Sequence, residues 1–140
     1  MKQMPKRLSI YVDGCSRGNP GPSGIGVIVC DENGKAFKDV SKYIGDATNN
    51  VAEYYALIYG LQEALILRAD EVIINTDSEL LAKQLSKEYK IKNAILKSLH
   101  EQVRHLLTGL KKYDIKHINR TENKGADKLA NKAIEQESLF

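Results

Sequence analysis

The sequence lacks the residues that mark several classes of protein. Its 140 residues include no Trp and two Cys, and Cys15 and Cys30 do not have Cys-x-x-Cys spacing. This cysteine usage predicts neither a disulfide framework nor a zinc site. No apolar run approaches the roughly 20 residues that cross a bilayer, and the basic segment 1–7 leads into no continuous apolar stretch. We therefore expect no membrane span, no secretion signal and a cytoplasmic location.

A large excess of one charge is also missing. Lys and Arg together number 21 and Asp and Glu 18, which gives a net charge of +3 and a pI of about 8.8. Such a balance is compatible with a polyanionic partner but does not by itself indicate one. A chain of this length buries roughly two thirds of its unfolded surface on folding. We expect a single domain over residues 1–140, acting as a monomer.

Hydrophobic periodicity predicts the order of the elements. Leu8, Ile10 and Val12 alternate with polar residues up to Asp13, which is typical of a strand with one buried face. A turn-rich segment, 15–24, follows, and Asp31 to Gly34 should form a hairpin turn, so the chain opens with an antiparallel meander. The expected strands are 8–13, 25–30, 35–44, 72–77 and 113–119, and the expected helices are 49–68, 78–87, 93–109 and 125–137. The prediction is an α/β fold with a five-stranded mixed sheet, its first three strands antiparallel, flanked by helices.

Four carboxylates stand at chemically suggestive places in this order. Asp13 and Asp77 end two strands that a long helix connects, so as parallel neighbours they would converge at one edge of the sheet. Glu53 lies near the start of that helix, and Asp127 lies on the last one. Carboxylates are the ligands that Mg²⁺ prefers, and two divalent ions about 4 Å apart can support hydrolysis of a phosphodiester. The structural alternatives are a turn former at Asp13, a capping side chain at Glu53, a helix N-cap at Asp77 and a first-turn acid at Asp127.

Four segments of the chain resemble motifs of ribonuclease H type 1, in the order that this family has them. They read YVDGCSRGNPGPSGIG (11–26), TNNVAEYYAL (48–57), NTDS (75–78) and ENKGADKLA (122–130). The resemblance covers essentially the whole chain. It implies a ribonuclease H-like fold and an endoribonuclease that hydrolyses the RNA strand of RNA-DNA hybrids, leaving 5′-phosphate and 3′-hydroxyl ends.

The resemblance also implies roles for individual residues. The catalytic metal ligands are Asp13, Glu53, Asp77 and Asp127, with two Mg²⁺ ions as cofactors and Mn²⁺ as a substitute. The substrate-binding residues are Gly14, Asn19, Thr48, Asn49 and Asn50, with Thr48 on a phosphate of the DNA strand and the asparagines at the minor groove. The alternative for the three asparagines is loop geometry and helix capping, for which this residue type is well suited; Asn49 or Asn50 would then cap the long helix.

The sequence departs from the family pattern in two places. Many members carry a histidine in a flexible loop before the last aspartate. Here His117 falls within an expected strand, and Arg120 stands at the start of the short polar loop that includes residues 121–124. Both are candidates for an auxiliary role. The lysine-rich helix with tryptophans that some members insert is absent, which suggests weaker binding and tolerance of double-stranded RNA. The lysines at 83, 87, 90, 92 and 97 could contact phosphates in place of that helix. The interpretation that we favour is that they form a solvated face.

The end of the chain, residues 136–140, resembles the peptide by which bacterial replication proteins bind the sliding clamp. Leu139 and Phe140 would enter an apolar pocket while Gln136 anchors the backbone; the alternative is that they pack on their own domain or fray. A rival for the whole chain is a catalytically inactive nucleic-acid binding module of the same fold. A proofreading-type exonuclease is disfavoured, because its Asp-x-Glu motif is replaced here by Asp13-Gly14-Cys15.

Overall fold

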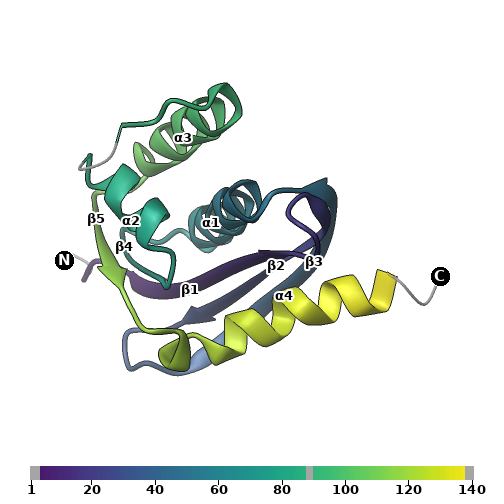
Figure 1. Cartoon of the computed structure of the whole chain (residues 1–140). Helices are drawn as coiled ribbons and strands as arrows, with labels where there is room; N and C mark the ends of the chain where they lie inside the picture. The colour runs from purple at the N-terminus through teal and green to yellow at the C-terminus, as the bar shows by residue number, and fades with distance from the viewer. Residues whose placement is uncertain (1–3, 88–89, 138–140) are drawn as a thin grey trace.

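A five-stranded mixed sheet forms the centre of the molecule in the computed structural model, which describes residues 4–87 and 90–137 (Figure 1). Its strands, in the spatial order β3-β2-β1-β4-β5, are β1 (Arg7–Ser16), β2 (Gly21–Cys30), β3 (Ala36–Ala47), β4 (Glu71–Thr76) and β5 (Lys112–His117). β2 pairs antiparallel with β1 and β3, and β4 pairs parallel with β1 and β5. The predicted fold class and the antiparallel opening are confirmed.

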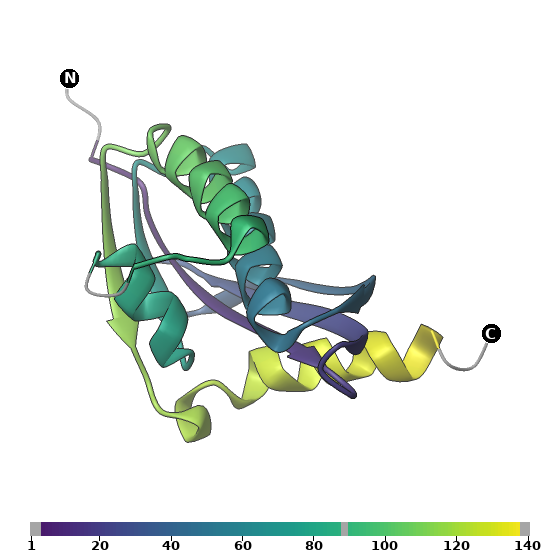
Figure 2. The same cartoon turned by 45° about the horizontal axis from the view of Figure 1, so that its top comes forward.

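Helices cover the two faces of this sheet unequally. On one face lie α1 (Asn49–Ile66), α2 (Glu79–Leu85) and α3 (Ala94–Leu107); α4 (Lys124–Glu137), preceded by the short 3-10 helix η1 (Arg120–Glu122), crosses the other (Figures 1 and 2). α1 packs directly on β1 and β2, and α3 packs on α1. The core lies between α1 and the sheet, and its fully buried side chains include Ile10, Val12, Ile25, Tyr54, Leu57 and Leu61. Among the described residues, no helix is long and apolar enough to cross a membrane.

The first two strands are longer than the sequence predicts. β1 does not end at Asp13 but continues to Ser16, and β2 begins at Gly21 instead of Ile25. The paired positions Gly14↔Ile25, Cys15↔Gly24 and Ser16↔Ser23 extend the ladder into the turn-rich segment. The reversal itself needs only residues 17–20, where Gly18 and Asn19 have positive φ values of 107° and 29°. Turn-forming composition located the reversal, but ladder hydrogen bonds determine how far the strands run.

Glycines in β2 explain how α4 reaches its position. A Cβ atom on Gly26 would lie 2.0 Å from the carbonyl oxygen of Ala126, and one on Gly24 would lie 2.4 Å from that of Ala130. The backbone of α4 therefore rests directly on β2, at a distance that only glycine permits. Ser41 of β3 adds a hydrogen bond from its Oγ to the carbonyl oxygen of Leu129 at 2.6 Å. These contacts fix the helix that carries Asp127.

The helix caps differ from those predicted. Thr48, and neither Asn49 nor Asn50, is the N-cap of α1, and its Oγ1 accepts a hydrogen bond from the Val51 amide at 3.2 Å. Ser78, and not Asp77, is the N-cap of α2. The cap predicted at Asn49 or Asn50 and the structural alternative of a cap at Asp77 are both wrong by one or two residues, because several residues in each stretch have side-chain oxygens suited to this role. The correction leaves the carboxylate of Asp77 without a capping role, whereas Asp127 does lie in the first turn of α4, as the structural alternative for it proposed.

Candidate active site

Two adjacent parallel strands place the first two acids of the site. Val12 of β1 pairs with Thr76 of β4, so Asp13 and Asp77 occupy the next positions along the two chains. Asp77 therefore follows the carboxyl end of β4, and Asp13 lies beside it within β1. Open α/β sheets bind ligands at this edge. Asp13 is buried, with 5% of its surface exposed, and Asp77 is half-buried. The prediction that these strands are neighbours is confirmed.

The third acid, Glu53, reaches this edge because α1 begins almost in contact with β1. A Cβ atom on Gly14 would lie 2.3 Å from the carbonyl carbon and oxygen of Ala52 and 2.6 Å from the amide nitrogen of Glu53. Glycine at position 14 thus lets the first turns of α1 approach β1. The close approach brings the Glu53 carboxylate next to that of Asp13.

The three side chains form one compact cluster. One carboxylate oxygen each from Asp13, Glu53 and Asp77 lie within 4.8 Å of one another, a spacing that fits a shared metal ion. They line a cavity of about 670 Å³, together with residues from β1, α1, α2, η1 and α4. The cluster therefore has both the ligands and the access that a metal bound to a large substrate would need.

The fourth predicted ligand, Asp127, lies at the same cavity but outside the three-acid cluster. It is exposed, in the first turn of α4, and it lies close enough to Asp13 to raise the pKa of that carboxyl group. Asp13 therefore interacts with all three other acids: Glu53 and Asp77 within the cluster, and Asp127 outside it. This arrangement offers two ligand sets that share Asp13.

Burial and mutual repulsion set the electrostatics of the cluster. Burial raises the pKa of Asp13 to about 8, and the charge of Asp77 adds to the effect. Burial also raises the pKa of Glu53 well above its ordinary value, as do the charges of Asp13 and Asp77, while a hydrogen bond from the Gly14 backbone opposes the change. The Oε2 atom of Glu53 is buried and, among the described residues, has no hydrogen-bond partner. A cation would relieve both the repulsion and this unsatisfied oxygen.

Cys15 lies beside these acids without joining them as a reactive group. It is half-buried at the cavity, and burial followed by the charge of Asp13 raises the pKa of its thiol to about 11. The thiol is protonated at neutral pH and is a poor nucleophile or metal ligand.

The predicted substrate-binding asparagines connect the turn between β1 and β2 to the start of α1. Oδ1 of Asn19 accepts a hydrogen bond from the Asn49 amide at 2.9 Å, and Oδ1 of Asn49 accepts one from the Ser16 amide at 2.8 Å. The loop-geometry alternative is therefore correct for both side-chain oxygens. Asn19, Asn49 and Asn50 are exposed, and the last two line the cavity. The amide NH₂ groups of Asn49 and Asn50 are donors that a ligand in the cavity could meet.

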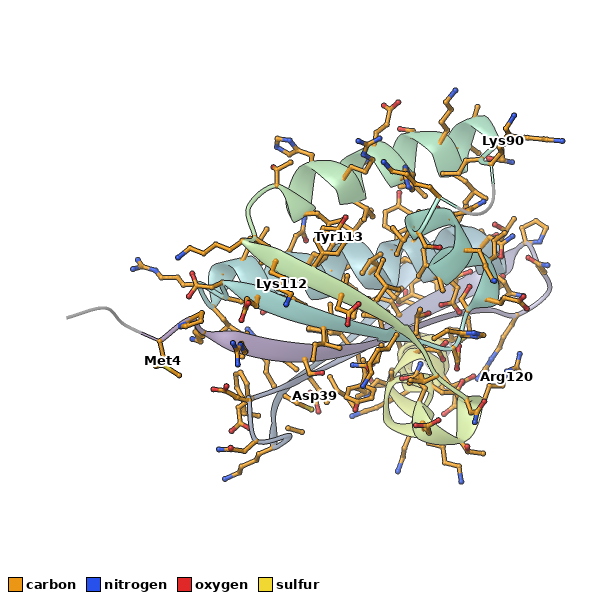
Figure 3. The ribbon with its side chains drawn as sticks, turned by 90° about the vertical axis from the view of Figure 1, so that its left-hand side faces the viewer. Met4, Asp39, Lys90, Lys112, Tyr113 and Arg120 are labelled. Carbon is orange, nitrogen blue, oxygen red and sulfur yellow. The ribbon has the colours of Figure 1, made fainter. Side chains whose placement is uncertain are left out.

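The two auxiliary candidates differ in position. His117 is the last residue of β5, as expected from its alternation, and it is exposed but does not line the acid cavity. Arg120, the first residue of η1, does line it; the segment expected to be an irregular loop is partly helical. Figure 3 shows Arg120 beyond the end of β5, while Lys90 lies beside the start of α3. The exposed Lys87, Lys90 and Lys92 are not among the residues that line the cavity.

Several residues of the site were not singled out from the sequence. Asn123 is almost fully buried just before α4, and its Nδ2 donates to the carbonyl oxygen of Val12 at 3.0 Å, which joins the start of α4 to the residue before Asp13. It falls within the quoted motif 122–130, but a polar residue in a polar loop gives no signal of burial. Glu79, Thr121, Lys124 and Asn131 also line the cavity. Of the predicted tail, Gln136 is exposed in the last turn of α4, and Leu139 and Phe140 lie outside the described residues.

Comparisons with known proteins agree with this geometry. The family model described as reverse transcriptase-like matches residues 11–133. Ribonuclease HI of Halobacterium salinarum is 39% identical over 92% of this chain. The chain spans 65% of the length of that protein. A crystal structure of RNase H1 from this archaeon, at 38% identity, superposes with a TM-score of 0.91 over 93% of this chain and 98% of that one.

Two further relatives are matched over nearly their whole length. Ribonuclease H of Pseudomonas entomophila is 34% identical over 95% of this chain and 97% of its own. LC11-RNase H1, isolated from compost by a metagenomic approach and crystallised in complex with an RNA/DNA hybrid, is 41% identical, with a TM-score of 0.88 over 95% of this chain and 99% of that one. Together with the acid cluster, these matches show that the chain belongs to the ribonuclease H type 1 family.

Proposed function

We propose that this protein is a ribonuclease H that hydrolyses the RNA strand of RNA-DNA hybrids with divalent metal ions held by its acidic cluster. The observation that carries the proposal is the convergence of Asp13, Glu53 and Asp77, from three separate parts of the chain, in one cavity. Membership of the family supports it, as does the RNA/DNA hybrid bound to the relative LC11-RNase H1. The chain spans 65% of the length of the Halobacterium relative.

The donor set fits two magnesium ions. Asp13, Glu53 and Asp77 would hold one, and Asp13 together with Asp127 would hold the other, because Asp13 interacts with all three of the other acids. Hard carboxylate oxygens suit Mg²⁺, with Mn²⁺ as a substitute, and both ions keep part of their hydration. When bound, such a pair supplies an activated water and stabilises the charge that develops on the phosphate and the leaving oxygen.

The neighbouring residues would bind and orient the hybrid. The NH₂ groups of Asn19, Asn49 and Asn50 would donate to base edges and sugars in the minor groove, next to the backbone of Gly14. Thr48 would donate its hydroxyl proton to a phosphate of the DNA strand, since a hydroxyl oxygen that accepts a bond from Val51 still donates one. Contacts to 2′-hydroxyl groups would select RNA as the strand that is cut.

Of the two auxiliary candidates, Arg120 is the better placed. Its guanidinium would approach the scissile phosphate as a fixed cation, because Arg120 lines the acid cavity and His117 does not. Replacing Arg120 by Ala should then lower the rate of cleavage more than replacing His117 by Ala. Equal effects of the two substitutions would contradict this assignment.

Cleavage of a labelled RNA-DNA hybrid tests the proposed function. In Mg²⁺ or Mn²⁺ we expect RNA fragments with 5′-phosphate and 3′-hydroxyl ends, and no cleavage in EDTA or by an Asp13→Asn variant. Hybrid binding without cleavage by the wild type would indicate the rival binding module. Full activity of the variant would show that the acid cluster is not the active site.

Two partners remain proposals with separate tests. A double-stranded RNA of the same sequence in that assay tests the proposed tolerance, and failure to cut it rejects the idea. The sliding clamp is the proposed partner of Gln136, Leu139 and Phe140. A clamp pull-down in which the chain without residues 136–140 binds as well as the full chain would remove that proposal.

A further inference from the structure

Asp127 is the most exposed of the four acids of the site. Asp13 is buried and Glu53 is packed against Gly14, but Asp127 is exposed at the rim of the cavity. An exposed carboxylate next to another carboxylate is driven outward by repulsion and keeps its rotamer freedom. A neighbouring donor must therefore hold it if it is to be oriented before a metal binds.

Asn131 supplies that donor from the next turn of α4. Its Nδ2 donates to the backbone oxygen of Asp127 at 3.0 Å and to Oδ1 of the same residue at 3.3 Å. The two residues are four apart, which places them on one face of the helix. Asn131 itself lines the acid cavity.

Arg17 holds Asn131 in turn, from a segment far away in the sequence. Its Nη2 donates to Oδ1 of Asn131 at 3.2 Å and forms an ion pair with Oε1 of Glu135, also at 3.2 Å. Because Arg17 takes the oxygen of this amide, it presents the NH₂ group to Asp127. The backbone amide of Arg17 donates to the carbonyl oxygen of Pro22 at 2.9 Å, so the residue is anchored in the turn that also carries Asn19.

We propose that Arg17 and Asn131 are positioning residues that orient Asp127 for metal binding and connect the turn of Asn19 to the metal site. The inference rests on the proposed function. Its physical basis is preorganisation: a ligand already held in place loses less conformational freedom when the ion binds. A purely structural role would instead attach α4 to the turn and affect stability alone.

Metal binding in the absence of substrate separates these roles. Calorimetric titration of Mn²⁺ into the full chain should show affinity weakened roughly 2- to 10-fold by Asn131→Ala, the range for one net hydrogen bond. Arg17→Met should weaken it less, since the donor to Asp127 remains but loses its orientation. Lys132→Ala is the matched control, because Lys132 is the exposed next residue of α4 and does not line the cavity.

A double-mutant cycle and thermal unfolding complete the test. With Asp127→Asn already present, Asn131→Ala should have no further effect on Mn²⁺ affinity, because the group that it positions has changed. Thermal unfolding without metal shows whether each variant is folded. If Asn131→Ala does not fold, the Mn²⁺ affinity of Arg17→Met decides between the positioning role and the purely structural one. Unchanged Mn²⁺ affinity in the folded variants, or an undiminished effect of Asn131→Ala beside Asp127→Asn, overturns the inference. Failure of the wild type to cleave hybrid would instead overturn the proposed function. The two outcomes are distinguishable, because the titration measures Mn²⁺ binding without substrate.

Discussion

Asp13 is the residue on which the electrostatics of the site depend. A carboxyl group whose pKa is higher in the folded protein holds its proton more tightly there, so the folded state loses stability as the pH rises from the ordinary value to the raised one. For Asp13 that window runs from 3.8 to about 8. The metal-free protein should therefore be less stable at pH 8 than at pH 5, and its affinity for metal should increase over the same window.

An Asp13→Asn variant tests this charge directly. Because the amide cannot ionise, the metal-free variant should be more stable than the wild type at pH 8 by several kcal/mol, since the pKa of Asp13 rises from 3.8 to about 8 on folding and each pKa unit corresponds to about 1.4 kcal/mol. The difference should vanish near pH 4. Urea unfolding in EDTA at the two pH values measures it. A variant less stable than the wild type at pH 8 would show that Asp13 stabilises the fold.

At the scale of elements, the site depends on the contact between β1 and α1. Gly14→Ala would place a Cβ atom 2.3 Å from the backbone of Ala52, so α1 must move and carry Glu53 away from Asp13. We expect a loss of about 1–3 kcal/mol in the free energy of unfolding from overpacking. Activity on hybrid should decrease at least about 100-fold, because small displacements at an active site are this costly.

Gly34→Ala is the matched control for that substitution. Gly34 has a φ of 83° and open space around its Cβ position, in the hairpin between β2 and β3. The strain costs about 1 kcal/mol, but the hairpin does not belong to the acid cavity. Stability should decrease while activity per folded molecule stays the same. Similar losses of activity in both variants would mean that Gly14 acts through stability alone.

The elements also show what the sequence can and cannot predict. Period-two alternation before Asp13 and the apolar run before Asp77 located both strands, because burial of one face or of both is visible in local composition. The extension of β1 to Ser16 depends on pairing with β2, and the burial of Asn123 depends on its bond to Val12. Such long-range contacts have no local signal. The separation of Asp127 from the other three acids likewise follows from the packing of α4 on Gly24 and Gly26.

For the whole molecule, a metal that binds only the folded state must raise its stability. At a concentration 100 times the dissociation constant the gain is about 2.7 kcal/mol, which should raise the unfolding midpoint by several degrees. Scanning calorimetry with Mg²⁺ or Mn²⁺, then with EDTA, measures this shift. Asp13→Asn should abolish it. A shift of the same size in that variant would place the bound metal away from the cluster.

The most direct test of the account is to locate the metal and the substrate together. Crystals of an Asp127→Asn variant with an RNA-DNA hybrid and Mn²⁺ would keep the cluster of Asp13, Glu53 and Asp77 intact, and anomalous scattering would reveal the ion. We predict a manganese peak within ligand distance of those three carboxylates and beside a phosphate of the RNA strand. A peak remote from Asp13, or one beside the DNA strand, would contradict the account.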